Sequence, residues 1–218
     1  MTNDEFEGFL RSCSRDTPEG SVTDSTLRII NDLLRTRPPR RSLETGCGRT
    51  TALLSHLSEH HTVFCVEDSG NRAIASVTAA RNNVEWIYGP SQRTLPRYEF
   101  TQPIDFALID GPHGYPFPEL EYFYIYPELA EGAWLLVDDV QIPTIHHFFS
   151  FLKDEKMFEF VTRSGDTAFF RRTSAPLFNP YGDGWWEQQY NISNLYRFKP
   201  WTVRLKMLVR RFIGMESR

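Results

Sequence analysis

The sequence has few cysteines and no long apolar run. Cys13, Cys47 and Cys65 are the only cysteines among 218 residues. Three widely spaced cysteines fit neither a disulfide framework nor a zinc site, so we expect reduced thiols. No apolar stretch approaches the roughly 18 residues that span a bilayer. The opening residues MTNDEFEGFL lack the basic-then-apolar order of a secretory signal. We therefore expect a cytoplasmic protein.

The formal net charge is −4, and it is unevenly distributed. Residues 197–218 hold seven Lys or Arg and one acid, a net of +6. The other 196 residues hold 17 basic and 27 acidic side chains, a net of −10. An acidic body repels nucleic-acid phosphates, which argues against a general nucleic-acid binder.

Short apolar runs alternate with amphipathic ones along most of the chain. Residues 24–36 place leucine and isoleucine at helical spacing before a Pro-Pro pair. The strand-like runs that follow are residues 41–45, 62–68, 84–89, 104–110 and 133–139, and the helical candidates between them are residues 50–60, 71–82, 118–129 and 143–156. Such alternation predicts an α/β fold with a mostly parallel sheet and helices on both faces.

The apolar period changes to two over residues 157–172, on both sides of Ser164-Gly165-Asp166. This pattern predicts an antiparallel hairpin that completes a seven-stranded sheet. We expect one domain over residues 1–173, with N-terminal helices in residues 1–38. Residues 174–218 would form an ordered aromatic and basic extension.

The turn after the first predicted strand reads LETGCGRTT, with Glu44, Gly46 and Gly48. Ligands of an open α/β sheet sit beyond the carboxyl ends of the strands, where glycines let the backbone approach them closely. A pyrophosphate would favour a third glycine at position 51 and no carboxylate nearby, but the chain has Thr51. A carboxylate favours a cationic ligand group, and S-adenosylmethionine offers both an amino group and a sulfonium.

Two further strand ends support a nucleoside ligand. Glu67 ends the second predicted strand, where a carboxylate accepts hydrogen bonds from ribose hydroxyls, and Asp68 is the neighbouring alternative. Gly89-Pro90-Ser91 forms the next turn and is expected to border the adenine.

With these motifs, residues 40–172 resemble a class I S-adenosylmethionine-dependent methyltransferase of the family 24 type, similar to small-molecule O-methyltransferases. Thr50 departs from the third glycine of many relatives, although small hydroxyl residues are common there. The resemblance implies a Rossmann-like fold and a cofactor site made by Glu44, Gly46, Cys47, Gly48, Thr51, Glu67, Asp68, Ser91 and Asp110.

Asp110, Asp138 and Asp139 follow the fourth and fifth predicted strands. Converging carboxylates repel one another unless a cation is present, and Mg²⁺ prefers oxygen ligands. The three positions resemble the metal triad of catechol-type and macrocin-type O-methyltransferases. The alternative is that these acids border the cofactor or form turns without a metal.

His113 stands where catechol-type enzymes carry a lysine that deprotonates the acceptor. Imidazole suits a general base because its ordinary pKa, about 6.5, is near neutral pH; a structural loop histidine is the alternative. Tyr115 and Phe117 are candidates for an acceptor-pocket wall, with core packing as the alternative. His146 and His147 are expected to be structural.

The basic end has its own pattern. Trp201, Leu205, Leu208 and Phe212 form an apolar stripe on a helix predicted from about Pro200, with basic residues beside it. Such a helix suits peripheral contact with an anionic membrane, but docking on its own domain or on a second subunit of a homo-oligomer is the alternative.

The sequence thus predicts methyl transfer from S-adenosylmethionine to a hydroxyl of a small molecule, a sugar or phenolic metabolite. Two alternatives stay open at this level. One is a catalytically idle methyltransferase-like domain that binds a partner through its C-terminal extension. The other, disfavoured by Glu44 and by the predicted hairpin, is a nicotinamide-dependent oxidoreductase.

Overall fold

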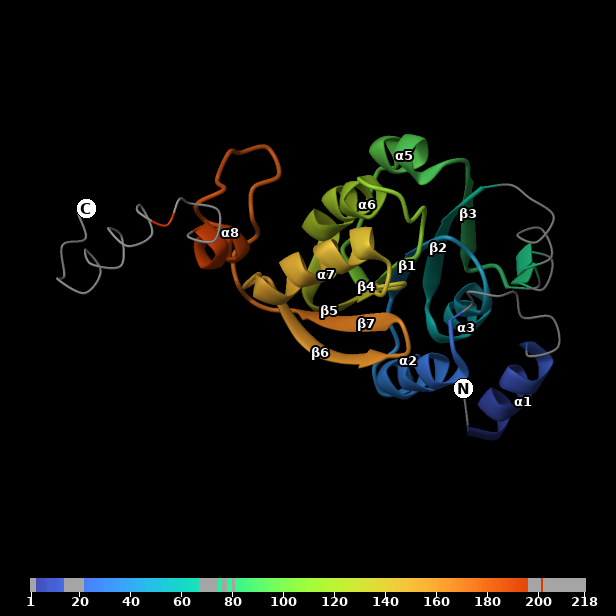
Figure 1. Ribbon diagram of the computed structural model, residues 1–218. Helices are drawn as coiled ribbons and strands as arrows, with labels where there is room; N and C mark the ends of the chain where they lie inside the picture. The colour runs from blue at the N-terminus through green and yellow to red at the C-terminus, as the bar shows by residue number, and fades with distance from the viewer. Residues whose placement is uncertain are drawn as a thin grey trace.

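The computed structural model describes residues 3–13, 22–66, 74–75, 78–79, 81–195 and 201. Figure 1 shows a central sheet with helices on both sides. The strands are β1 (Arg41–Thr45), β2 (His60–Cys65), β3 (Val84–Tyr88), β4 (Ile104–Ile109), β5 (Leu129–Val137), β6 (Phe158–Ser164) and β7 (Thr167–Arg172). The helices are α1 (Asn3–Cys13), α2 (Asp24–Thr36), α3 (Arg49–Leu57), α5 (Ser91–Thr94), α6 (Phe117–Ile125), α7 (Pro143–Asp154) and α8 (Gln189–Asn194), with 3-10 turns η2 (Leu95–Arg97) and η3 (Tyr126–Glu128).

The seven strands lie in the order β3-β2-β1-β4-β5-β7-β6. Strands β1 to β5 pair in parallel, whereas β7 is antiparallel to both β5 and β6. The predicted α/β fold with its terminal antiparallel hairpin is confirmed. The strand order reverses between β1 and β4, and this reversal is where open α/β sheets bind ligands.

The side chains of β4 alternate between the two faces of the sheet, and helices cover both faces. Phe106 and Leu108 pack with α1, α2 and α3, whereas Ala107 and Ile109 face the cluster that contains α6 and α7. All four side chains are buried, as expected for a central strand with two covered faces. Each buried large apolar side chain contributes about 1.5–3 kcal/mol. The two layers are visible in Figure 1.

Several observed element bounds differ from the predicted ones, most clearly at β5 and after Gly89. Strand β5 begins at Leu129 rather than residue 133, because Gly132 (φ +74°) interrupts the apolar pattern inside a longer strand. Helix α5 and η2 after Gly89 were not predicted, since both are single short turns. The helix predicted at residues 71–82 falls largely outside the described residues.

The chain after β7 packs against the domain. The Tyr126 hydroxyl donates to the Phe178 carbonyl (3.0 Å), and the Tyr190 N–H donates to Glu155 Oε1 (2.9 Å). These contacts extend the ordered structure to α8, while the division at residue 173 stays a prediction. The predicted basic helix after Pro200 lies outside the described residues except Trp201. Within the described part of the chain, every helix is too short or too polar to cross a bilayer.

Candidate active site

The turn between β1 and α3 depends on Gly46. Its φ is +85°, its N–H donates to the Phe64 carbonyl (2.9 Å), and a Cβ here would overlap the Asp110 carbonyl oxygen. Only glycine combines this backbone angle with so close a contact. Gly48 differs, because its backbone is extended and a Cβ would meet nothing within 4 Å. The turn is therefore closed against β4 at Gly46 and open at Gly48.

Glu44 is enclosed rather than open to a ligand. Its side chain is 1% exposed, and its carboxylate accepts hydrogen bonds from the Thr50 (2.6 Å) and Thr51 hydroxyls. His61 Nε2 lies 3.2 Å from the same carboxylate. Through these hydrogen bonds Glu44 stabilises the first turn of α3. The helix dipole also favours a negative charge at this position. The predicted contact of Glu44 with a ligand cation stays a prediction.

A cavity of about 380 Å³ lies at the carboxyl ends of β1 to β4. This volume is in the range of small-molecule sites. Its walls are Gly46, Phe64, Cys65, Val66, Gly89, Pro90, Ser91, Gln92, Asp110, Gly111, Pro112 and Glu121. The cavity thus brings together three predicted cofactor residues, Gly46, Ser91 and Asp110. Glu44, Cys47, Gly48 and Thr51 are outside this lining, and Glu67 and Asp68 lie outside the described residues.

A second group of predicted residues meets beside this cavity. Oxygen atoms of Asp110 and Asp139 and a ring nitrogen of His113 all lie within 4.8 Å of one another. His113 Nε2 is 3.0 Å from Asp139 Oδ2 and 3.9 Å from Asp110 Oδ1. Asp139 has φ 55°, a backbone position that carries strain in a non-glycine residue and is frequent at functional sites.

Asp138 does not join this group. It is buried, and its Oδ1 accepts a 2.5 Å hydrogen bond from the Thr167 hydroxyl on β7. Consecutive side chains at the end of a strand point to different sides, so the side chains of Asp138 and Asp139 point in different directions after β5. In the described geometry Asp110, His113 and Asp139 lie together, and the metal triad of Asp110, Asp138 and Asp139 stays a prediction.

Burial and mutual charge shift the titration of this group. Burial raises the pKa of Asp110 to about 7, and the charges of Asp138, Glu44 and Asp139 act in the same direction. Burial likewise raises the pKa of Asp138. The adjacent carboxylates, Asp110 first and then Asp139, raise the pKa of His113. A half-exposed imidazole held between two carboxylates is suited to exchange protons with a bound hydroxyl group.

Comparison with known families finds a match that covers this site. A family model described as a methyltransferase domain matches residues 43–140, which run from β1 to the end of β5. The match covers 98 of the 218 residues, from residue 43 to residue 140. Both the glycine turn and the Asp110, His113 and Asp139 group lie within the matched residues.

Solved structures with the same fold are distant in sequence. An O-methyltransferase from Bacillus cereus in complex with S-adenosylhomocysteine is 16% identical, with a TM-score of 0.62 over 79% of this chain and 92% of that chain. The O-methyltransferase TomG from Streptomyces achromogenes, in complex with S-adenosylmethionine, is 18% identical, with a TM-score of 0.63 over 80% and 92%. The N-methyltransferase NodS from Bradyrhizobium japonicum is 14% identical, with a TM-score of 0.51 over 78% and 99%. No curated protein matches the sequence significantly.

Glu121 lies within the matched residues and was not among the predicted site residues. It is 1% exposed on α6, and its Oε2 accepts a hydrogen bond from the Thr45 hydroxyl (2.8 Å). Thr45 Oγ1 in turn accepts the Asp110 N–H (3.1 Å). A Cβ at Gly111 would overlap Glu121 Oε1. One signal was available: Glu121 and Glu119 are the two acids in a helix whose other residues are apolar or aromatic.

The stability of the domain should depend on pH through Glu121. Burial raises its pKa to about 7 from 4.5, against the opposing effect of the Ser91 and Thr45 hydroxyls. Between these values the folded state binds more protons than the unfolded state, so the free energy of unfolding falls as pH rises through this window. The loss should reach about 3 kcal/mol above pH 7.

The measurement is urea unfolding of the protein and of Glu121→Gln at several pH values from about 5 to 8. The glutamine variant should show the smaller loss of stability on going to high pH. Glu187→Gln, at an exposed position, is the control and should follow the original protein. Equal pH dependence in the protein and Glu121→Gln would contradict the assignment.

Proposed function

We propose that the protein transfers a methyl group from S-adenosylmethionine to a hydroxyl group of a small molecule. The observation that carries the proposal is the glycine turn at β1, closed at Gly46 and open at Gly48, beside a cavity bordered by Ser91 and Asp110. The methyltransferase family match over residues 43–140 supports the same conclusion. The distant neighbours whose structures contain S-adenosylmethionine or S-adenosylhomocysteine share this fold.

In this proposal His113 is the general base. Methyl transfer is an in-line displacement at a sulfonium carbon, so the protein mainly positions the acceptor oxygen and removes its proton. The other ring nitrogen, Nδ1, is the group that accepts this proton, because Nε2 is held against Asp139. The adjacent Asp139 carboxylate, 3.0 Å away, orients the ring and stabilises the imidazolium that results.

We include a divalent metal ion in the proposal as a partner of the acceptor. Its protein ligands would be the oxygens of Asp110 and Asp139, which suit a hard cation such as Mg²⁺. Asp138 is the weaker candidate because Thr167 engages its carboxylate. When bound, the ion would lower the cost of placing two carboxylates together and would favour the deprotonated acceptor oxygen.

Chelation should test the metal. Treatment with EDTA is expected to lower the methyl-transfer rate at least about tenfold, because such ions supply several kcal/mol of charge stabilisation. Added Mg²⁺ should restore the rate. Asp139→Asn should raise the Mg²⁺ concentration for half-maximal activity more than Asp138→Asn does. A rate that EDTA leaves unchanged removes the metal from the proposal.

The direct test of the proposed activity uses methyl-labelled S-adenosylmethionine and a panel of sugars, phenols and amines. We expect label in a hydroxylated acceptor, with equimolar release of S-adenosylhomocysteine. Labelling only of amines would contradict the O-methyltransferase assignment while leaving methyl transfer itself standing. Failure of every acceptor despite tight cofactor binding would favour the catalytically idle alternative.

A further inference from the structure

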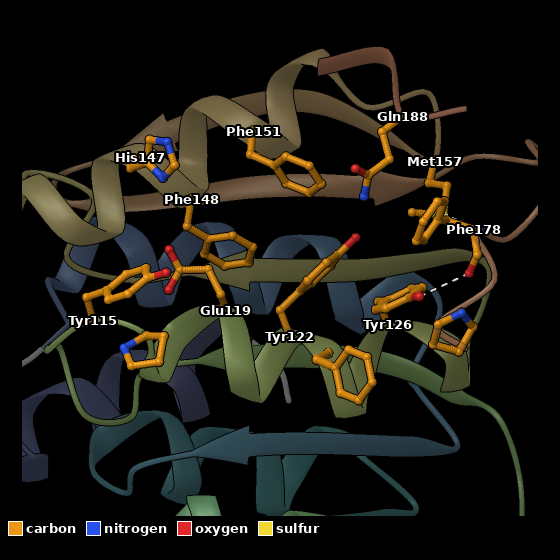
Figure 2. A pocket seen from close by; sticks show the side chains of 13 residues that line it. Tyr115, Glu119, Tyr122, Tyr126, His147, Phe148, Phe151, Met157, Phe178 and Gln188 are labelled. Atoms are coloured by element: carbon orange, nitrogen blue, oxygen red, sulfur yellow. Dashed lines mark hydrogen bonds between the residues drawn. The ribbon is translucent and has the colours of Figure 1, made fainter. Parts of the chain in front are cut away.

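A second cavity, of about 320 Å³, lies between α6 and α7 and is bordered by the chain that follows β7. Figure 2 shows its lining side chains, with Tyr115 and His147 at one end and Met157 and Phe178 at the other. The Tyr115 end begins two residues after His113. The cavity is lined by Tyr115, Pro116, Glu119, Tyr122, Phe123, Tyr126, His147, Phe148, Phe151, Met157, Phe178, Pro180 and Gln188.

Glu119 is the one acid among these described lining residues, and none of them is Lys or Arg. Both of its carboxylate oxygens are buried, and neither has a hydrogen-bond partner within the described part of the chain. Glu119 lies in the first turn of α6, where the helix dipole favours an acid. The dipole supplies no donor to these oxygens, however. A buried carboxylate without a partner costs free energy that a bound cation would offset.

The remaining walls are suited to a cation with an apolar body. The Tyr122 ring lies 5.1 Å from Phe148 and 6.3 Å from Phe151, measured between centroids. Aromatic faces attract organic ammonium groups. The Tyr122 hydroxyl is also buried without a partner, and Figure 2 shows it pointing toward the Gln188 side of the cavity. A ligand with an ammonium group and a small polar group would satisfy both orphaned groups.

We propose that this cavity binds a small organic ammonium ion whose charge is held by Glu119 and whose apolar body lies along Tyr122 and Phe148. A metal ion fits poorly, because Glu119 is the only carboxylate in the described lining and hard cations require several oxygens. An anion would meet the Glu119 charge with no Lys or Arg in the described lining to compensate. The inference stands apart from methyl transfer, although the cavity starts at the loop that carries His113.

The probes are 2-phenylethylammonium, neutral 2-phenylethanol and anionic phenylacetate, each titrated by ligand-observed NMR against the full chain. The ammonium should bind at least about tenfold more tightly than the alcohol, because a charged hydrogen bond contributes about 1.5–3 kcal/mol. Phenylacetate should bind least. Equal affinity for the ammonium and the alcohol, or no binding of the ammonium at millimolar concentration, would overturn the proposal.

Glu119→Gln is the decisive variant, and Glu187→Gln is its control at an exposed acid next to Gln188 in sequence. Glu119→Gln should weaken ammonium binding about tenfold or more, leave 2-phenylethanol binding unchanged and raise the unfolding temperature of the ligand-free protein. Glu187→Gln should keep the original affinity within about twofold. If Glu119 serves the helix dipole alone, Glu119→Gln instead lowers the unfolding temperature and leaves ammonium binding intact, which refutes the site.

A second variant places the site independently of Glu119. Tyr115 is 72% exposed, so Tyr115→Ala should leave the fold intact. It should weaken ammonium binding about two- to fivefold through the loss of one aromatic face. Unchanged ammonium affinity in Tyr115→Ala would move the ligand away from this end of the cavity and contradict the proposed arrangement.

Discussion

Replacing His113 with alanine should lower kcat for methyl transfer by about 100-fold or more, because a positioned general base contributes about 10²–10⁴-fold. The affinity for S-adenosylhomocysteine should stay nearly unchanged. His113 is half-exposed, and its Nε2 lies 3.0 Å from Asp139 Oδ2. It is outside the described lining of the cavity at the carboxyl ends of β1 to β4. The measurement is single-turnover transfer of labelled methyl, with cofactor affinity followed separately by calorimetry.

Two variants separate the base from a structural loop histidine. His113→Lys keeps a group that accepts a proton and should retain more activity than His113→Ala. His60→Ala, at a partly exposed histidine that contacts Glu85, should keep full activity. Full activity in His113→Ala would end the base assignment. Equal loss in the lysine and alanine variants, with lowered thermal stability in both, would assign His113 to loop structure.

Gly46→Ala should destabilise the fold and abolish cofactor binding together. The left-handed backbone at φ +85° costs an L-residue about 1–2 kcal/mol, and the added Cβ would overlap the Asp110 carbonyl oxygen. A total loss of unfolding free energy above about 2 kcal/mol lowers Tm by at least about 4–8 °C in a domain of this size. Differential scanning calorimetry measures the change.

Gly48→Ala is the matched control for this turn. Its backbone is extended and a Cβ would meet nothing within 4 Å, so Tm should change by less than about 2 °C. The same Cβ should nevertheless weaken S-adenosylhomocysteine binding, since the proposal places the cofactor in the open space at Gly48. A Tm loss in Gly48→Ala equal to that in Gly46→Ala would show that the two glycines serve only the fold.

The sheet could be predicted because its apolar runs are periodic and well separated. Residues 24–36 were predicted as a helix and form α2 with the same bounds. The hairpin around Gly165 was equally clear, because a period of two on both sides of a glycine turn fits only an antiparallel pair. The predicted start of β5, residue 133, is four residues too late, because Gly132 interrupts the apolar pattern.

The site was predicted as a set of positions, and its geometry needed the structure. Asp110, His113 and Asp139 meet because adjacent parallel strands end at one edge, which sequence order implies. The separation of Asp138 from Asp139 depends on the backbone turn at Asp139 and on a hydroxyl from β7. Neither is visible in a pattern of residue types.

The surroundings of the buried acids were the main omission. Contact of Glu44 with a ligand cation stays a prediction, and the structure adds its hydrogen bonds from the Thr50 and Thr51 hydroxyls, an arrangement set by helix capping geometry. Glu119 and Glu121 sit two residues apart on α6 and face different cavities. Helical spacing gives their relative direction, but the role of each comes from packing against neighbours far away in sequence.

Titration calorimetry with S-adenosylhomocysteine, with NAD as the comparison ligand, tests the central claim most directly. The account predicts a saturable one-to-one heat with S-adenosylhomocysteine, weakened by Gly48→Ala, and no measurable heat with NAD. Absence of heat with S-adenosylhomocysteine at millimolar concentration, or equal binding of NAD, would contradict it.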